Sequence, residues 1–577
     1  MSCRSDWREW RWVLLVSALI VGLSVLPYVI VWLLTPAGLV YTGFLTNPLD
    51  GHTYLAKMRQ GAAGEWLFRL PFTTEPQRGV LIYGHYLALG RLSAWLGLPL
   101  IGTYHAARCA GGLFLLLVGY RLIAEFVPEA KGRRVAFLIF ALSSGLGWLM
   151  AGFGIMGLDL WVPEANTFYS IFANAHFALA EALMILIFLS VAAPLGQGAG
   201  RATGSGERGC PDARASELEG PHQDNRRLTP GYGAETAGRG GARGPFPCPS
   251  ALRLALSVGA SLALAIVMPL MLAVVFAVLA LFLAWRTLGR PLESRARAVA
   301  SWARAIVAGL ACCPFLVYYF MVVQRDAAMA AWSAQNVTPG PALWQLLAGY
   351  GFLVPLALLG MGWGLLRGRG DFLLIWVGVT VAFVYAPFAL QRRMLMGFHA
   401  PVAIWAALGL IHVMWPLARR RQSLVTLVAF LLLTPTTLFV LSMPVMGAMK
   451  GEWPLFMSVG EKAALQWLRE QSSRDDVVLA SPQIGLMVPA WAGNRVIYGH
   501  PFETIEAARK QAEVERFFAG QSDPGELVSR YDVRYIFVGP KERALGGFDV
   551  GRLSPEWSLD VAYSNEEVTV YRVVARR

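Results

Sequence analysis

The fold is decided by the stretch WVLLVSALIVGLSVLPYVIVWLL, residues 12–34, and by the polar segment Thr46-Asn47-Pro48-Leu49-Asp50-Gly51-His52-Thr53-Tyr54 that follows it. About 20 apolar residues suffice to cross the ~30 Å hydrocarbon core of a bilayer. The run is too long for a cleaved signal peptide, and no small-residue cleavage site follows it, so we expect a signal anchor that is retained. Asp50 then lies just beyond the outer end of a membrane helix, where a carboxylate can act on a substrate at the bilayer surface.

Composition places the chain among polytopic membrane proteins. Of its 577 residues, 56% are hydrophobic and 15% are charged, the mean hydropathy is +0.49, and apolar runs recur to about residue 446. In a soluble protein the net charge of +13 would suggest a nucleic-acid partner, but many arginines lie in short loops between apolar runs, where they set orientation. We therefore expect no nucleic-acid partner. The six cysteines show no metal-ligand spacing, so we expect neither disulfides nor a zinc site.

The distribution of basic residues predicts the topology. Arg4, Arg8 and Arg11 precede the first span, so the N-terminus is expected in the cytoplasm and the loop 35–101 outside. Pro269 divides the apolar stretch 251–285 into two spans. The expected spans, about eleven in number, are 12–34, 102–125, 135–155, 172–195, two within 251–285, 303–323, 341–365, 371–389, 399–417 and 423–446.

Three regions differ in composition. Residues 1–446 form the membrane region, interrupted at 196–250 by a stretch rich in Gly, Arg, Glu and Pro that we expect to be a disordered cytoplasmic linker. Residues 451–577 predict a small soluble α/β domain outside the membrane. Its expected elements are a helix at 461–471, a solvated helix at about 505–520, strands at 477–479, 495–498 and 535–538, and a hairpin of 559–562 with 568–571. This domain shows no nucleophile–base pair and no phosphate loop, which favours a structural or gating lid.

The loop 35–101 holds most of the residues that could carry chemistry. It is unusually polar and aromatic for a membrane protein, and Gly79 to Gly97 forms an amphipathic stretch suited to the plane of the interface. A plain solvated loop with aromatic belt residues is the alternative for most of its positions. Besides Asp50, the candidate site residues in the outer loops are His52, Tyr54, Glu75, Asp159 and Glu164.

Arg392 and Arg393 form a second candidate group. The predicted topology places both outside, against the general trend, and two guanidiniums at the outer surface are well matched to a phosphate. Headgroup contact or snorkelling is the alternative. A third group lies in or near the spans and comprises His105, Arg108 and His176, with Asn174 and Glu181. Ionisable groups there are costly unless they have a partner or a role, and Arg108 with Glu181 could be a structural pair.

One span, an Asp in a long outer loop with interfacial helices, about ten further spans and an outer C-terminal domain together resemble the class C (GT-C) glycosyltransferases. The layout is similar to the protein O-mannosyltransferases, the aminoarabinose transferases of lipid A and the RgtA/B/C/D-like bacterial group. The segments Asp50–Gly61, Thr73–Pro76 and Gln391–Arg393 look like those of bacterial members with the same tail domain. Many members have a second acidic residue beside the loop Asp, whereas Gly51 follows Asp50 here, and Glu65, Glu75, Asp159 or Glu164 could substitute for it.

The resemblance implies an inverting enzyme of the plasma (inner) membrane. It implies transfer of a sugar from a polyprenyl-phosphate donor to a lipid, glycan or protein acceptor at the outer face. Asp50 would be the catalytic base on the acceptor hydroxyl, and Arg392 with Arg393 would hold the donor phosphate. No nucleotide sugar and no certain cofactor is implied, and a divalent cation is left open.

Two other functions remain open from the sequence. A transporter or flippase of a lipid-linked or small polar substrate would place charges at the midplane and show inverted repeats with broken helices. A non-catalytic membrane scaffold would gather no charged residues at one place. A transferase would gather Asp50 with Arg392 and Arg393 around an outward-facing cavity.

Overall fold

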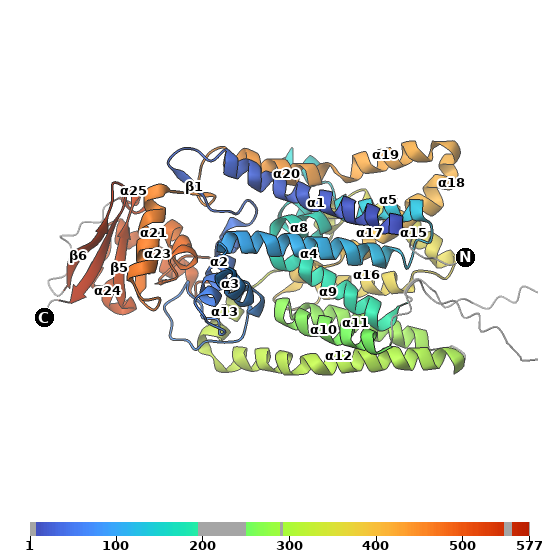
Figure 1. Cartoon of the computed structure of the whole chain (residues 1–577), viewed down its shortest axis with the longest axis horizontal. Helices are drawn as coiled ribbons and strands as arrows, with labels where there is room; N and C mark the ends of the chain where they lie inside the picture. The colour runs from blue at the N-terminus through green and yellow to red at the C-terminus, as the bar shows by residue number, and fades with distance from the viewer. Residues whose placement is uncertain (1–6, 194–249, 289–291, 547–556, 576–577) are drawn as a thin grey trace, which may run out of the picture.

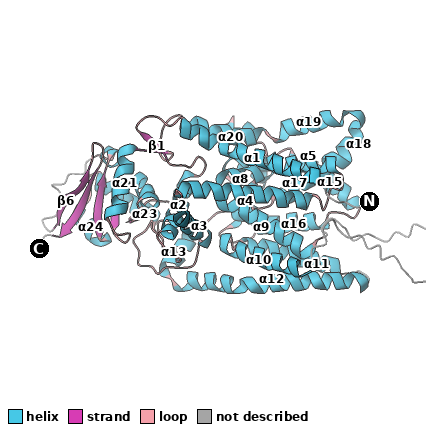
Figure 2. Ribbon diagram, viewed as in Figure 1, coloured by secondary structure: helices cyan, strands magenta, loops and turns pink. Residues whose placement is uncertain are grey.

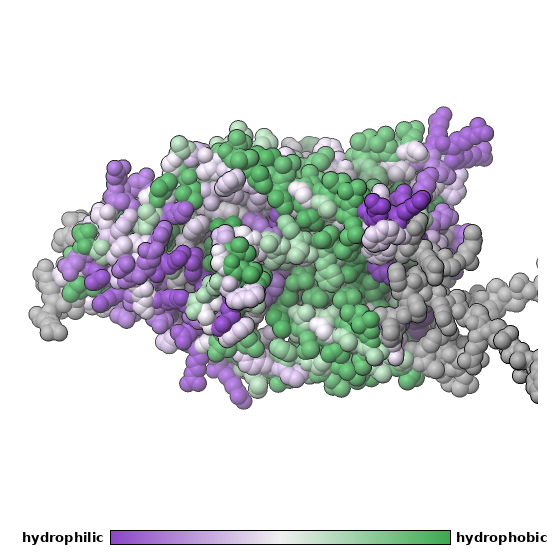
Figure 3. Space-filling view, viewed as in Figure 1, coloured by the Kyte–Doolittle hydropathy of each residue, from purple (hydrophilic) through white to green (hydrophobic). Residues whose placement is uncertain are grey.

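A bundle of membrane helices with an α/β domain at one end makes up the molecule (Figures 1 and 2). The computed structural model describes residues 7–193, 250–288, 292–546 and 557–575. The stretch expected to be a linker, 196–250, lies almost entirely outside these residues. Hydrophobic residues cover the middle of the molecule, and hydrophilic ones gather on the α/β domain and at the opposite end (Figure 3). This is the surface expected of a protein that crosses a membrane.

The helices of the membrane region are α1 (Trp7–Leu33), α4 (Leu100–Ile123), α5 (Ala130–Leu142), α6 (Gly147–Ala151), α9 (Ala175–Ala192), α10 (Ser250–Val267), α11 (Met271–Thr287), α12 (Leu292–Arg325), α14 (Leu343–Tyr350), α15 (Leu353–Leu366), α16 (Asp371–Val384), α17 (His399–Gly409), a π-helical turn (Leu410–Met414), α18 (Trp415–Ala418), α19 (Gln422–Leu433) and α20 (Pro435–Ala448). The shorter elements between them are α7 (Leu158–Trp161), η1 (Pro163–Ala165), α8 (Thr167–Ala173), α13 (Ala327–Gln335), η2 (Gln391–Leu395) and η4 (Arg419–Arg421).

The number of membrane crossings agrees with the sequence. Seven helices in the described part of the chain are long and apolar enough to span a bilayer, and the pair α14 and α15, bent by 87°, makes an eighth. One of the seven, His399–Ala448, would be about 75 Å long if straight. It turns instead at η4, and α19 and α20 run back along the bundle (Figure 1). When His399–Ala448 is counted as two segments and the shorter apolar helices α11 and α16 are added, the described residues contain eleven apolar segments, the number of spans expected. The predicted division at Pro269 is confirmed, because α10 ends at Val267 and α11 begins at Met271.

The first outer loop contains α2 (Pro48–Ala62) and α3 (Gly84–Leu96), which pack backbone against backbone. A Cβ atom on Gly61 would lie 2.0 Å from the carbonyl oxygen of Leu87, and one on Gly90 would lie 1.9 Å from that of Met58. Only glycine permits so close an approach. This contact fixes the position of α2, the helix that carries Asp50.

A five-stranded sheet with order β4-β3-β5-β7-β6 forms the C-terminal domain. β3 pairs in parallel with β4 and β5, and β7 pairs antiparallel with β5 and β6. The elements are β2 (Phe456–Ser458), α21 (Val459–Gln471), β3 (Val477–Leu479), α22 (Pro482–Trp491), β4 (Arg495–Val496), α23 (Ala507–Phe518), α24 (Pro524–Tyr531), β5 (Val533–Val538), α25 (Pro540–Ala544), β6 (Trp557–Ser564) and β7 (Thr569–Ala575). The predicted helices, strands and hairpin are all present. β2 also pairs with β1 (Leu39–Tyr41), which ties the domain to the loop after α1.

Candidate active site around Asp50

Asp50 lies in the first turn of α2, at the end of the bundle that faces the C-terminal domain. Pro48 begins the helix after Asn47, whose φ of 46° reverses the chain. Asp50, Tyr54 and Lys57 are spaced by four and three residues, so they share one face of the helix. Protein atoms surround Asp50 densely, yet 45% of its side chain remains accessible. A ligand can therefore reach this carboxylate, and we refer to the accessible space beside it as the recess.

His500 of the C-terminal domain faces Asp50. Its Nε2 lies 3.5 Å from Oδ1 of Asp50, and its own side chain is 3% exposed. The other ring nitrogen, Nδ1, accepts hydrogen bonds from the backbone N–H groups of Phe502 (3.1 Å) and Glu503 (3.2 Å). Because Nδ1 is an acceptor, the neutral ring carries its hydrogen on Nε2 and directs it toward the carboxylate. The loop that follows β4 thus presents a donor to Asp50.

The electrostatic surroundings keep Asp50 ionised. Burial raises the pKa of its carboxyl group, but the hydrogen bond from His500 and the charges of Arg393 and Lys57 outweigh burial and lower the pKa below its ordinary value. A carboxylate with a lowered pKa is deprotonated at neutral pH and can accept a proton from a substrate hydroxyl.

Lys57 and Glu503 form a buried ion pair beside the recess. The ammonium of Lys57 lies 2.8 Å from Oε1 of Glu503 and donates to Oγ1 of Thr53 at 3.2 Å. It also lies 4.1 Å from the ring centroid of Tyr83. The pair joins α2 to the same loop that carries His500. The second carboxylate oxygen of Glu503 has no partner among the described residues.

Tyrosines form one wall of the recess. The rings of Tyr54 and Tyr86 are stacked, with centroids 4.6 Å apart and an interplanar angle of 8°, and Tyr104 continues the stack at 6.4 Å from Tyr86. His176, at the start of α9, makes a 2.7 Å hydrogen bond to the hydroxyl of Tyr86 and contacts Tyr54 edge-on. His176 therefore holds the aromatic wall that begins one helical turn beyond Asp50.

The two arginines predicted to act together share their acidic neighbours but differ in one aromatic contact. Arg393, in η2, interacts electrostatically with Glu164, Tyr54 and Asp50. Burial lowers the pKa of Arg393, but the interactions with these groups, above all with Glu164, outweigh burial and raise the pKa. Arg392 also interacts electrostatically with Glu164 and Asp50, and its guanidinium lies 4.4 Å from the ring centroid of Trp161. Both arginines and Glu164 therefore belong to the electrostatic surroundings of Asp50.

His105 and Arg108 form hydrogen bonds that connect helices within the bundle. The guanidinium of Arg108 is 1% exposed and donates to the carbonyl oxygens of Ile171 (2.9 Å) and Phe172 (3.2 Å). His105 is linked to the carbonyl oxygen of Gly43 at 2.8 Å. The suggested pair of Arg108 with Glu181 is wrong, because Glu181 accepts from Ser170 at 2.6 Å instead. These contacts join α4 to α8 and to the loop after α1.

Asp159 and His52 have structural contacts. Oδ2 of Asp159 accepts from the backbone N–H groups of Gly145 (2.9 Å) and Gly147 (3.2 Å), and burial raises the pKa of its carboxyl group to about 6. His52 donates through Nδ1 to the carbonyl oxygen of Pro48 at 2.6 Å, and burial lowers its pKa to about 4. Neither side chain contacts the Asp50 carboxylate in the described part of the chain.

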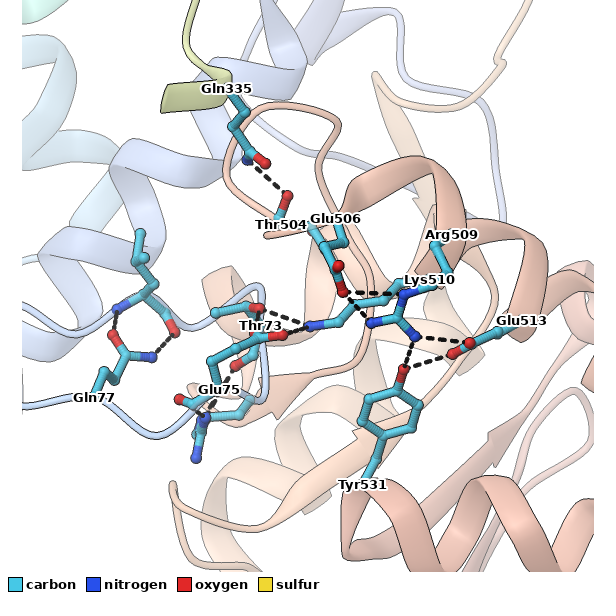
Figure 4. A network of polar contacts seen from close by, with 12 residues as sticks. Thr73, Glu75, Gln77, Gln335, Thr504, Glu506, Arg509, Lys510, Glu513 and Tyr531 are labelled. Atoms are coloured by element: carbon cyan, nitrogen blue, oxygen red, sulfur yellow. Dashed lines mark hydrogen bonds and ion pairs between the residues drawn. The ribbon is translucent and has the colours of Figure 1, made fainter. Parts of the chain in front are cut away.

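Glu75 joins the outer loop to the C-terminal domain. Its carboxylate pairs with the fully buried Lys510, which also donates to Oγ1 of Thr73 at 2.9 Å (Figure 4). Arg509, the neighbour of Lys510 in sequence, donates to Glu513, which also accepts from Tyr531. Arg495 donates to the backbone oxygens of Thr73 (3.1 Å) and Glu75 (3.0 Å), and Gln335 donates to that of Thr504 (2.8 Å). Glu75 is therefore a docking residue of the junction and has no contact with Asp50.

Sequence reasoning missed His500 and Glu503, which lie in the C-terminal domain that we expected to contribute no reactive group. A signal was present, since both residues follow the short β-run 495–498. Loops at the carboxyl ends of parallel strands commonly carry functional residues. Among the described residues, no group of three or more His, Cys, Asp or Glu side chains is arranged to hold a metal ion.

Comparisons with known proteins found similarity at the level of structure. No family model and no curated protein matches the chain. An oligosaccharyltransferase of Archaeoglobus fulgidus is 14% identical, with 92% of this chain and 69% of that chain covered and a TM-score of 0.45. ArnT of Cupriavidus metallidurans bound to undecaprenyl phosphate is 11% identical, with coverages of 96% and 97% and a TM-score of 0.48. The mycobacterial arabinofuranosyltransferase AftD is 13% identical, with coverages of 98% and 40% and a TM-score of 0.49. These proteins are class C glycosyltransferases, the group that the sequence resembles.

Proposed function

We propose that this chain is an integral-membrane glycosyltransferase that moves a sugar from a polyprenyl-phosphate donor to an acceptor hydroxyl, with Asp50 as general base. The single observation that carries the proposal is the accessible carboxylate of Asp50, which lies 3.5 Å from His500 and interacts electrostatically with Arg393. A base for the acceptor and a cation for the leaving phosphate are the two groups that this reaction requires.

The reaction follows from these two groups. The acceptor hydroxyl gives its proton to Asp50 while its oxygen forms a bond to C1 of the sugar. The bond from C1 to the phosphate oxygen breaks, and its electron pair stays on the lipid phosphate, where Arg393 offsets the negative charge. Attack on the face of C1 opposite to the phosphate inverts the anomeric centre. His500 positions the carboxylate through its Nε2–H.

The orientation is part of the proposal. Arg419, Arg420 and Arg421 lie at the end of the bundle where α1 begins, opposite to the C-terminal domain (Figure 1). Basic residues of short loops are retained in the cytoplasm. Asp50 and the domain 451–577 would then lie outside the cytoplasm, above the plasma (inner) membrane.

The orientation can be tested by labelling. A cysteine in place of Glu566, which is exposed at the tip of the β6–β7 hairpin, should react with a membrane-impermeant maleimide in intact cells. Cys210 should react only after the cells are permeabilised. Labelling of Cys210 but not of Glu566→Cys in intact cells would reverse the orientation.

A transporter is the second candidate. The 87° bend between α14 and α15 has the form of the broken helices found in transporters. Backbone and apolar side chains fill the space at this bend, however: a Cβ on Gly349 would lie 2.8 Å from Leu158, and one on Gly145 would lie 2.2 Å from the carbonyl oxygen of Gly349. A filled bend offers no site for a polar substrate, so the transferase is favoured.

The test is transfer of a labelled sugar by the purified protein. Polyprenyl-phosphate sugars would be supplied with a panel of lipid, glycan and peptide acceptors, and Asp50→Asn should reduce the rate by about 10²–10⁴-fold. Asp475→Asn is the matched control, because Asp475 is an exposed carboxylate on the same side of the molecule. Transfer by a correctly folded Asp50→Asn protein at the rate of the wild type would refute the role of Asp50.

A further inference from the structure

A cavity of about 540 Å³ lies on the opposite face of α2 from Asp50. Arg59 lines this cavity. It follows Asp50 by nine residues, which places it about 14 Å further along α2 and on the opposite side of the helix. The other walls are the corner between α3 and α4, with Leu98, and one face of α21. The cavity is thus separate from the recess of Asp50.

Positive charge lines this cavity without an acidic counterpart. The cationic lining residues are Arg59, Lys462 and Arg469, and no Asp or Glu is among the described residues that line it. Lys462 and Arg469 are seven residues apart, so both project from the same face of α21. Carboxylates nearby are engaged elsewhere, as Glu461 is with Lys541. Burial, with the charges of Arg469 and a further arginine, lowers the pKa of Arg59 to about 10.

Two further features add to the positive character of the cavity. The N-terminus of α4, a 24-residue helix, borders it through Leu100 and Ile101. Unpaired N–H groups at such an end favour an anion. Trp491 also lines the cavity, and its indole N–H has no acceptor within the part of the chain that the structure describes.

One edge of the cavity is apolar. The corner between α3 and α4 exposes large apolar side chains, with Trp95 at 81%, Leu98 at 50% and Leu96 at 49%. Trp and Leu at such a corner are typical of a segment seated at the level of the headgroups. Apolar residues and cations side by side along the lining match a molecule that has a hydrocarbon tail and a negative head.

We propose that this cavity binds the phosphate headgroup of an anionic membrane lipid. Arg59 belongs to the membrane-side helix α2, whereas Lys462 and Arg469 belong to the C-terminal domain. A phosphate held between them joins the two parts of the molecule. This inference depends on the membrane location of the chain and not on the proposed transferase activity.

The full chain, purified in a neutral detergent, would be titrated with dihexanoyl phosphatidylglycerol while its thermal unfolding is followed. A ligand that binds only the folded protein raises the melting temperature in a saturable manner. We expect saturable stabilisation by this lipid, at least tenfold weaker binding by dihexanoyl phosphatidylcholine, and no saturation by inorganic phosphate in the same concentration range. Saturation by inorganic phosphate at equal concentration would identify a soluble anion and overturn the lipid assignment.

Variants locate the binding site. Lys462→Gln with Arg469→Gln should weaken phosphatidylglycerol binding at least tenfold, and both side chains are exposed, so the fold should tolerate the change. Arg516→Gln with Arg534→Gln removes the same charge from exposed positions of the same domain and should leave binding unchanged. Unaltered binding by the first pair, or an equal loss in both pairs, would overturn the proposal.

A cavity-filling variant shows whether the lipid binds in this cavity or only to positive charge on the protein surface. Ala94→Phe places a ring among the lining residues without changing any charge. It should weaken binding at least tenfold and leave the melting temperature of the lipid-free protein unchanged. Full binding by Ala94→Phe would place the lipid elsewhere and overturn the proposal.

Discussion

The contact of His500 with Asp50 can be tested by two substitutions that each keep one half of the imidazole. Asn at position 500 retains an acceptor near the place of Nδ1, so the backbone N–H groups of Phe502 and Glu503 stay satisfied. It has no donor that reaches Asp50. Gln at position 500 carries an N–H to the place of Nε2 but leaves those two backbone groups without their acceptor.

The size of each effect follows from the geometry. A hydrogen bond to a charged group contributes about 1.5–3 kcal/mol. The 3.5 Å separation and the 45% exposure of Asp50 reduce this to about 1 kcal/mol, or about fivefold in rate. His500→Asn should therefore lower kcat about fivefold with little change in melting temperature. His500→Gln should retain most of kcat but lose about 1–3 kcal/mol of stability, because buried donors are left unpaired.

The pH dependence of sugar transfer shows whether His500 acts on the Asp50 carboxylate or only contributes to packing. His500 lowers the pKa of Asp50, so its loss should raise that pKa. Since the ionised carboxylate is the base, the acidic limb of the rate profile should move to higher pH in His500→Asn and stay near its wild-type position in His500→Gln. Initial rates of sugar transfer across the acidic range, with thermal unfolding in parallel, would measure both. An unchanged profile and kcat in His500→Asn would refute the proposed contact.

Three further predictions concern the donor, the junction and the packing of α2. Arg393→Gln should raise the KM for the polyprenyl-phosphate sugar by at least about tenfold, because a charge-assisted phosphate contact is lost. Arg392→Gln should change this KM less than about threefold. Equal effects of the two substitutions in donor titrations would contradict the prediction that Arg393 makes the main phosphate contact. Lys510→Met should lower the free energy of unfolding by about 2 kcal/mol, because the partly exposed carboxylate of Glu75 loses its partner (Figure 4). The C-terminal domain should then be digested faster by a protease, and equal digestion rates in the variant and the wild type would contradict this prediction. Gly90→Ala should cost about 1–3 kcal/mol in thermal unfolding because its Cβ meets the α2 backbone, whereas Gly22→Ala, with open space around it, should be neutral.

Much of the fold could be predicted because its signals are local. A membrane helix satisfies its backbone hydrogen bonds within its own segment, so each apolar run is recognisable by itself. The break at Pro269 and the strands of the C-terminal domain follow from similarly local patterns. The position of Asp50 just after the first span was equally evident, because it depends only on where one run ends.

The partners of Asp50 could be known only from the tertiary structure. His500 reaches it across the junction because α2 packs on α3 through Gly61 and Gly90, and because the parallel strands direct the loop after β4 toward α2.

The sequence by itself therefore determined the apolar segments and the soluble domain, and it placed Asp50 just beyond the first of these segments. The tertiary structure decided which distant side chains surround that carboxylate, since local patterns define segments but not the faces on which they meet. The predicted pair of Arg108 with Glu181 is wrong for the same reason. Arg108 donates to the carbonyl oxygen of Ile171 and Glu181 accepts from Ser170, and these contacts depend on how α4, α8 and α9 pack.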